Sequence, residues 1–249
     1  PPAGPERPGP EAVEAAVARL GRIFDERHGG VRGAPKFPSS MPVRLLLRHH
    51  RRARDPRSLE LATRTLERMA AGGLMDQLGG GFHRYSTDER WLVPHFEKML
   101  YDNALLAVAY AEAYQVTGRR DFARVVRQTL DYLLRELATP EGAFHAASDA
   151  DSEGEEGKYF VWTLDELREV LGDEAAAFAD FHGVTGAGNF EGGASVLHVP
   201  APDEDRWERL APARARLLEA RSRRVPPLTD EKVLSGWNGL AISALAQGG

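Results

Sequence analysis

The stretch "FEKMLYDNALLAVAYAEAY", residues 96–114, decides the fold. From Leu105 to Tyr110 every side chain is apolar, so this part of the segment has no polar face at helical spacing. A helix that is apolar on all sides is stable only when other elements surround it. The sequence therefore predicts an inner helix here, which the rest of the chain has to enclose.

Three other segments have a single apolar stripe and are predicted to be half-exposed outer helices. Apolar residues recur at helical spacing over 13–24, 59–70 and 122–137. The segment from Asn238 onward is apolar on all sides, like the inner helix. The short segment from Pro42 shows the same character more weakly. The sequence thus contains helices of two kinds.

Inner and outer helices alternate along the chain. An outer helix ending near Ala71 precedes the inner helix, which turns at Gly118, a predicted C-terminal cap, into the outer helix from Asp121. Alternation in antiparallel hairpins is typical of an α/α toroid, whereas each helix of a four-helix bundle would show one stripe. We therefore predict a mainly α protein, an incomplete α/α toroid with short β-hairpins in the loops at one rim.

Short strand-like segments interrupt the helices. They are 81–87, 90–95, 143–148, 158–162 and 194–199. We expect the first two to form a hairpin and the next two to flank the acidic stretch 148–160. Thr163 to Glu166 has the pattern of a capping box and predicts the start of a further helix.

Composition limits the classes of function. With 249 residues, 42% of them hydrophobic, the chain can build a sizeable core, and its net charge of −5 gives no basic field for nucleic acid. The absence of cysteine excludes disulfides, thiolate zinc sites and CxxC redox centres within these residues. No apolar run is long enough to span a bilayer, and the first residues do not resemble a signal peptide. We expect a soluble, cytoplasmic protein.

The two ends of the chain suggest a fragment of a longer protein. Residues 1–10 are half proline, which predicts an extended linker, and 11–249 are expected to form one partial toroid domain. The apolar helix from Asn238 stops without a partner helix behind it.

Unusual residues concentrate in the loops that lead into the inner helices or leave an outer one. In a hairpin toroid the loops near His95, Asp149 and Trp237 emerge at the same rim. The N-termini of inner helices meet there too, and their free N–H groups favour anions and oxygen-rich ligands. We expect the functional site at this rim, with a small molecule such as a sugar as its ligand.

His95, Asp149 and Asp151 are the candidate catalytic residues. We expect His95, with Glu97 and Lys98, in the first turn of the inner helix, where a histidine can act as an acid or a base; a structural hydrogen bond is the alternative. Asp149 and Asp151 would share one face of an extended chain and split their pKa values by repulsion. The alternative is a solvated acidic turn.

The acidic stretch partly matches a calcium-binding loop. Asp149, Asp151 and Glu153 fall on its first, third and fifth positions, but Phe160 stands at position twelve, where a bidentate glutamate is required. A metal-dependent enzyme that combines these carboxylates with His83 is the weaker hypothesis. The glycines 79–81 do not form a dinucleotide-binding fingerprint. We predict no metal and no cofactor.

Other residues of the same loops are predicted to bind the substrate. Aromatic rings would stack on a sugar ring, with packing of the loops as the alternative, and polar groups would fix its hydroxyls. These residues are His83, Arg84, Tyr85, Trp91, Glu97, Tyr101, Asp102, Trp162, Lys232, Trp237 and Asn238. His83 and Arg84 alternate on a presumed strand, so only one of the two can face the site.

Four long motifs carry a resemblance to a known family. They are "GAPKFP", "DQLGGGFHRYSTDERWLVPHFEKMLYDNALL", "SDADSEGEEGKYFVW" and "DEKVLSGWNGLAI", and they span about residues 33–242. They resemble the thioredoxin-domain-containing proteins related to the spermatogenesis-associated thioredoxin-like protein. The resemblance implies a helical part similar to the six-hairpin glycosidases and the N-acylglucosamine 2-epimerases, preceded by a thioredoxin-like domain that this chain lacks.

Two functions follow as hypotheses. The first is a carbohydrate-active or sugar-related enzyme with the acid/base chemistry of a hydrolase or an epimerase. The second is a non-catalytic helical module that presents partners or substrates to the thioredoxin-like domain. Similarity of fold to sugar enzymes is an analogy and names no substrate.

Overall fold

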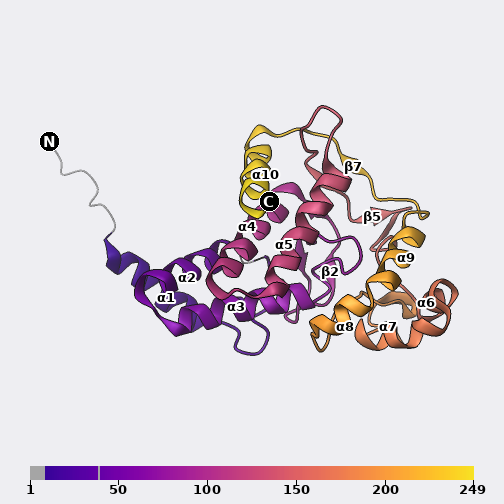
Figure 1. The fold of residues 1–249 in the computed structure, drawn as a ribbon, viewed down its shortest axis with the longest axis horizontal. Helices are drawn as coiled ribbons and strands as arrows, with labels where there is room; N and C mark the ends of the chain where they lie inside the picture. Colours follow the sequence, from indigo (N-terminus) through magenta and orange to yellow (C-terminus); the bar gives the residue numbers. More distant parts are fainter. Residues whose placement is uncertain (1–8, 39) are drawn as a thin grey trace.

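The inner helix predicted from the sequence lies at the centre of the structure. The computed structural model describes residues 9–38 and 40–249, and α4 (Leu100–Thr117) is surrounded by other helices (Figure 1). Its neighbours are α2 (Ser40–Ala53), α3 (Pro56–Ala71), α5 (Arg120–Tyr132) and α10 (Ser235–Gly248). The residues of α4 from Leu106 to Ala111 are all buried. The prediction of an enclosed helix is confirmed.

Two of the three predicted outer helices, α3 and α5, bury one side as their periodicity predicts. The third, α1 (Pro10–Ile23), has no buried residue and packs only its partly buried Val17 and Leu20 against the core. α3 buries Leu61 and Leu66, and α5, which continues as a π-helical turn over Leu133–Leu137, buries Phe122 and Leu130. α1 lies against α2. Gly118 has φ +69° and ends α4, so the predicted cap is confirmed.

Two predictions about the chain ends meet the structure only in part. The expected linker 1–10 falls almost entirely outside the described residues, and its last residue, Pro10, already begins α1. α10 buries Ala241 and Ala244 against the helical array, but Ile242 is 64% exposed. The full enclosure expected for this helix is therefore not observed in this chain.

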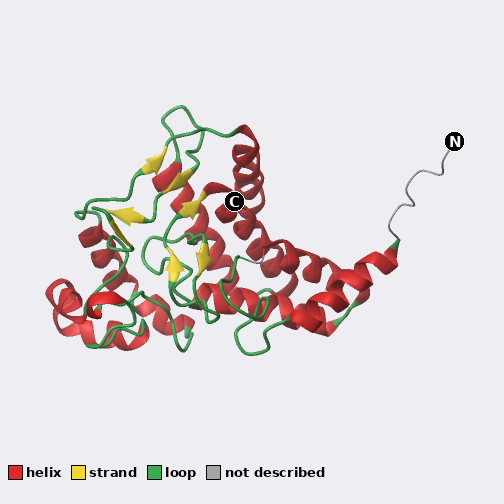
Figure 2. Cartoon of the chain, turned by 180° about the vertical axis from the view of Figure 1, so that it is seen from behind, coloured by secondary structure: helices red, strands yellow, loops and turns green. Residues whose placement is uncertain are grey.

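A small sheet joins the loops that were expected to meet at one rim. β3 (Lys98–Met99) precedes α4, β4 (Ala147–Ser148) follows the π-helical turn, and β7 (Thr229–Asp230) precedes α10. The strands pair antiparallel in the order β3-β4-β7. Figure 2 shows the strands gathered together beside the helical array. The prediction that these three loops emerge at one rim is confirmed.

The other strands partly follow the prediction. β1 (Tyr85–Ser86) and β2 (Pro94–His95) form the expected hairpin. The acidic stretch is itself a hairpin of β5 (Asp151–Ser152) and β6 (Glu155–Glu156), whereas 158–162 consists of turns and ends in a single bridge from Trp162 to Ser195. The expected strands at 158–162 and 194–199 were thus wrong. The chain turns at Gly157, whose φ is +77°.

The start of the inner helix was predicted four to five residues too early. His95, Glu97 and Lys98 precede α4 in extended backbone, because Pro94–His95 pair with β1 and Lys98–Met99 pair with β4. The pairing of strands has overridden the helical pattern here. His95 therefore projects from a strand and not from the first turn of a helix.

A second lobe lies between β6 and β7 and was not anticipated as a unit. It contains α6 (Leu164–Leu171), which begins with the predicted capping box at Thr163 and Glu166, and has its own core around Phe178 and Leu217. Its other helices are α7 (Ala175–Phe181), α8 (Glu204–Arg209) and α9 (Ala211–Arg221), with short 3-10 turns at Gly172–Glu174 and Glu191–Gly193. Figure 1 shows this lobe to one side of α5.

Candidate functional site

Two short backbone segments hold the polar residues of the rim. Residues 83–84 lie beside 97–98, and the N–H of Arg84 donates a hydrogen bond to the carbonyl of Glu97 at 2.7 Å. Side chains alternate in direction along extended backbone. His83 and Lys98 therefore point into the interior, where both are buried, while Arg84 and Glu97 point outward and stay partly exposed. His83 and Arg84 thus point to opposite faces, as predicted, and Arg84 is the one on the outer side.

The side chains on the outer side form two groups, and the first consists of an ion pair and a histidine. The guanidinium of Arg84 lies 2.7 Å from a carboxylate oxygen of Glu97. Nε2 of His95 lies 3.7 Å from the same oxygen, and Nδ1 of His95 is 2.6 Å from Oε1 of Glu156. The ring of Tyr85 stacks on His95 with centroids 5.0 Å apart. His95 is thus held between two carboxylates and an aromatic face.

Tyr101 and Asp102, at the start of α4, form the second of these groups. Burial raises the pKa of Asp102 to about 6, against the lowering effects of the Tyr101 hydroxyl and the Arg84 guanidinium. Burial and the charge of Asp102 also raise the pKa of Tyr101. A carboxyl with a pKa near neutrality can both hold and release a proton, which acid/base catalysis requires.

Trp237 adds an apolar face beside Tyr101. Its ring lies 4.8 Å from that of Tyr101, centroid to centroid, and it is half-buried at the start of α10. Asn238, the next residue, uses its amide to bond both backbone groups of Phe144, at 2.8 and 3.0 Å. Asn238 therefore anchors α10 to the loop before β4. We call Arg84, Tyr85, His95, Glu97, Tyr101, Asp102 and Trp237 the rim site.

The predicted catalytic aspartates lie at the surface of the protein. Asp149 and Asp151 are both exposed, and the carboxylate of Asp149 accepts a bond from the N–H of Ala150. Lys232 is also exposed and pairs with Asp230. The acidic hairpin reaches the rim site through Glu156, whose carboxylate lies 2.6 Å from Nδ1 of His95. The antiparallel register of β5 and β6 places it there.

Three other predicted binding residues lie in the interior. Trp91 is fully buried, and its indole N–H donates to the carbonyl of His28 at 2.8 Å. Trp162 is buried with Arg224 over its ring. His83 is buried, with Nδ1 2.8 Å from the carbonyl oxygen of Phe96. For the two tryptophans the structure shows the packing alternative, since their faces are covered by protein.

His83 borders a buried charged cluster that sequence reasoning missed. Asp76 receives a bidentate pair of hydrogen bonds from Arg221 and another from Lys98, all at 2.8 Å. These contacts outweigh burial and hold the pKa of Asp76 well below its usual range. Burial and the charge of Lys98 lower the pKa of His83 to about 3, so this imidazole is neutral.

The glycine run 79–81 packs the loop around this cluster. A Cβ on Gly80 would lie 2.3 Å from the carbonyl oxygen of Gln128, and one on Gly81 would lie 2.5 Å from the ring of Tyr132. Both glycines have positive φ. These residues therefore allow the loop to approach α5 closely. Within the described ranges, no three His, Asp or Glu side chains are grouped so that they could hold a metal ion.

Comparison with other sequences shows clear relatives. No protein-family model matches the chain. It is 37% identical to human spermatogenesis-associated protein 20 over 92% of its own length and 34% of that protein. It is 32% identical to an uncharacterised protein of Caenorhabditis elegans over 95% of its own length and 38% of that protein. The chain therefore spans between a third and two fifths of the length of these curated relatives.

Solved structures share the fold. A sugar epimerase from a ruminal bacterium has a TM-score of 0.51 at 12% identity, over 96% of this chain and 80% of that one. An unsaturated glucuronyl hydrolase specific for heparin has a TM-score of 0.51 at 10% identity, over 96% and 67%. In the part of the chain that is described, no helix is both long and apolar enough to cross a membrane. The chain is therefore related to spermatogenesis-associated protein 20 over about a third of that protein's length, and it has the six-hairpin glycosidase-like α/α fold.

Proposed function

We propose that the rim site binds a sugar or a sugar-related small molecule and transfers a proton to or from it. The observation that carries this proposal is the Asp102 carboxyl, whose pKa is raised to about 6 at the start of the inner helix. It lies next to Tyr101, and the ring of Trp237 contacts Tyr101. The fold is shared with proteins named as a sugar epimerase and a glucuronyl hydrolase, which supports sugar as the ligand class.

Each residue of the rim site has a distinct part in this proposal. Asp102 holds the proton that is transferred, and Tyr101 fixes the direction of its carboxyl. Arg84 neutralises Glu97 and lies close enough to bond a hydroxyl or carboxylate of the ligand. His95 is the second acid/base group, and the face of Trp237 stacks on the sugar ring. Asp149 and Asp151, in contrast, have no part in the chemistry.

Hydrolysis and epimerisation both require one group that donates a proton and one that accepts a proton, which are here Asp102 and His95. In hydrolysis a protonated carboxyl gives its proton to the leaving oxygen, while the second group accepts a proton from the water that adds to the sugar carbon. In epimerisation one group removes a proton from the carbon next to the carbonyl and the other returns a proton on the opposite face. The rim site supplies one carboxyl and one imidazole for either reaction.

The test is the pH profile of turnover by the full-length natural protein on a panel of aryl glycosides and reducing disaccharides. We expect an apparent pKa near 6 that is absent in Asp102→Asn, with a loss of about 10²- to 10⁴-fold in kcat. Asp131→Asn, an exposed change on α5, is the matched control. Wild-type protein without binding or turnover of any sugar, or an unaltered Asp102→Asn profile, would refute the proposal.

A non-catalytic docking role is the second candidate. The observation that favours it is the run of exposed apolar side chains around the start of α10: Leu228, Val233 and Ile242 are 77%, 53% and 64% exposed. Such side chains suit contact with another protein segment, for example the thioredoxin-like domain that the family resemblance implies. In this case Asp102→Asn leaves cellular function intact, whereas Ile242→Asp abolishes it.

A further inference from the structure

A pocket of about 250 Å³ lies between α3, α5 and α8 and shares no lining residue with the rim site. It far exceeds the roughly 10–15 Å³ that one water molecule needs, and it is smaller than most pockets for drug-sized ligands. Its apolar part is built by Phe122 and Val125 of α5, Phe181 and Trp207 of the second lobe, and Val199. All five side chains are buried, so the pocket offers a rigid apolar wall.

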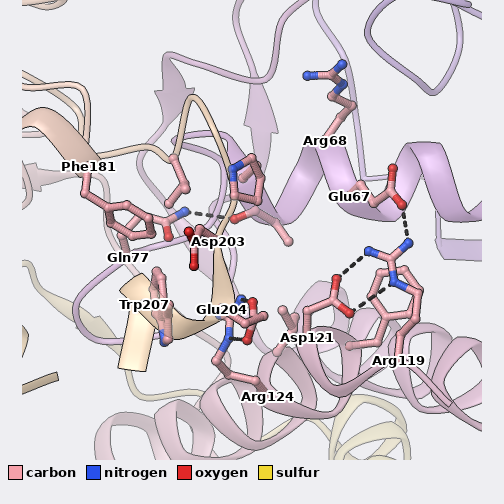
Figure 3. A pocket seen from close by; sticks show the side chains of 16 residues that line it. Glu67, Arg68, Gln77, Arg119, Asp121, Arg124, Phe181, Asp203, Glu204 and Trp207 are labelled. Atoms are coloured by element: carbon pink, nitrogen blue, oxygen red, sulfur yellow. Dashed lines mark hydrogen bonds and ion pairs between the residues drawn. The ribbon is translucent and has the colours of Figure 1, made fainter. Parts of the chain in front are cut away.

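Most charged side chains that line this pocket already have a partner of opposite charge or a hydrogen-bond donor. Arg119 is bonded to both Glu67 and Asp121, and Arg124 is bonded to Glu204 at 2.7 and 3.1 Å (Figure 3). The fourth carboxylate, Asp203, caps α8 by accepting the N–H of Arg206 at 2.9 Å. Every carboxylate that lines the pocket therefore already has a partner.

Arg68 is the exception among the cations. Figure 3 shows its guanidinium extending from α3 away from the ion pairs, and within the described ranges it makes no hydrogen bond or ion pair. Arg68 also lines an adjoining hollow of about 160 Å³, together with Arg90 and His198. That hollow has no acidic residue in its lining. The charge left without a partner at this place is thus positive.

We propose that this pocket is a second binding site, which takes a small organic acid with a flat apolar body. The carboxylate of the ligand lies between the guanidinium groups of Arg68 and Arg90, where it can form charge-assisted hydrogen bonds. The apolar body lies against Phe181, Val199 and Trp207, whose ring is fixed by Arg124 and Arg214 at 4.1 and 3.8 Å. Arg68 is charged and exposed and lies at the pocket entrance rather than inside the pocket. A ligand that enters with its apolar end first would therefore leave its carboxylate beside Arg68.

An alternative explanation for Arg68 is its place in the last turn of α3, where a cation is favoured by the helix dipole. That explanation accounts for one arginine on α3. It does not account for Arg90, which lies in a loop before β2 and lines the same hollow. A ligand carboxylate in this hollow would meet two cationic side chains and no carboxylate of the lining, which favours binding of an anion.

The test uses phenylacetate as the probe and NMR spectroscopy of the whole isotope-labelled chain. A probe of this size is expected to bind with a dissociation constant of about 1 mM and to shift the signals of the Arg68 side chain and the Trp207 indole. Phenylacetamide, which has the same body without the charge, should bind at least about tenfold more weakly. Inorganic phosphate alone should leave the Trp207 signal in place.

Three variants decide the assignment. Arg68→Gln should weaken phenylacetate binding about tenfold, Ala71→Leu should fill the pocket and abolish it, and Arg127→Gln, an exposed change on α5, should have no effect. All three changes are at solvent-accessible positions, so folding is checked by circular dichroism. Equal binding of acid and amide, or of wild type and Arg68→Gln, would overturn the proposal, as would the absence of shifts. Asp102→Asn should bind phenylacetate normally, which separates this site from the rim site.

Discussion

The buried cluster and the rim site share the two backbone segments 83–84 and 97–98, yet their charges behave in opposite ways. Lys98 and Asp76 are buried and bonded at 2.8 Å, and the pKa of Asp76 is held well below its usual range. One residue away, Glu97 belongs to a half-exposed group in which burial raises the pKa of Asp102 to about 6. The difference lies in the partners: Asp76 has two cations, whereas Asp102 has a hydroxyl and a more distant guanidinium.

This comparison assigns a structural task to one group and a chemical task to the other. A fully bonded carboxylate inside the protein cannot exchange its proton near neutral pH, but it fixes the backbone that carries it. The cluster ties the loop at Asp76 to Lys98 and to Arg221, the last residue of α9. The rim site, on the outer side of the same segments, is therefore held rigidly, while the raised pKa of Asp102 lets this carboxyl exchange its proton near neutral pH.

The largest effect is expected from breaking the buried cluster. Asp76→Ala leaves Lys98 and Arg221 as two buried cations without a counter-charge. Removal of one partner from a buried ionic group costs about 3–5 kcal/mol, so the free energy of unfolding should fall by this amount in urea denaturation. A fall of the unfolding free energy by this amount is expected only if the ionic cluster is buried and structural, because an exposed ion pair contributes less than about 1 kcal/mol. A change of less than about 1 kcal/mol would mean that the cluster does not hold the two lobes together.

The pH dependence of stability should differ in sign between the two regions. The folded-state pKa of Asp102, about 6, lies above the ordinary value of 3.8 for this side chain, so the native state binds this proton more tightly. Its contribution is complete below about pH 4 and is lost as the pH rises to about 6, by at most about 3 kcal/mol. Asp102→Asn should remove this decline.

His83 should give the opposite slope. Its pKa falls from 6.5 to about 3 on folding, so the unfolded state binds the proton more tightly. Its contribution is complete above about pH 6.5 and is lost as the pH falls. We expect His83→Gln to reduce the acid sensitivity of the unfolding free energy, measured in urea at a series of pH values. Asp102→Asn and His83→Gln should therefore change the slope of unfolding free energy against pH in opposite directions relative to the wild type. Changes in the same direction would contradict the comparison.

The helices and the meeting of the loops at one rim could be predicted because hydrophobic periodicity is local. Leu105 to Tyr110 determine the inner helix wherever the rest of the chain lies. The buried cluster could not be predicted, since Asp76 and Arg221 are 145 residues apart and nothing local pairs them. Strand register is equally non-local. It brought Glu156, and not Asp149 or Asp151, to His95.

The smallest effect is expected at this contact between the acidic hairpin and the rim site. Glu156 is 46% exposed, so its pair with His95 should contribute less than about 1 kcal/mol to stability. Its role is instead to orient the imidazole, because it bonds Nδ1 and leaves Nε2 facing Glu97. Glu156→Gln should therefore shift the NMR signals of the His95 ring while the unfolding free energy stays almost constant. Asp151→Asn, on the same hairpin, and Asp149→Asn, just before it, are the matched controls and should leave the His95 signals unchanged. If either control shifts these signals as much as Glu156→Gln does, the register of β5 and β6 does not select the carboxylate that holds His95, and the earlier assignment of the two aspartates to the site would be the better one.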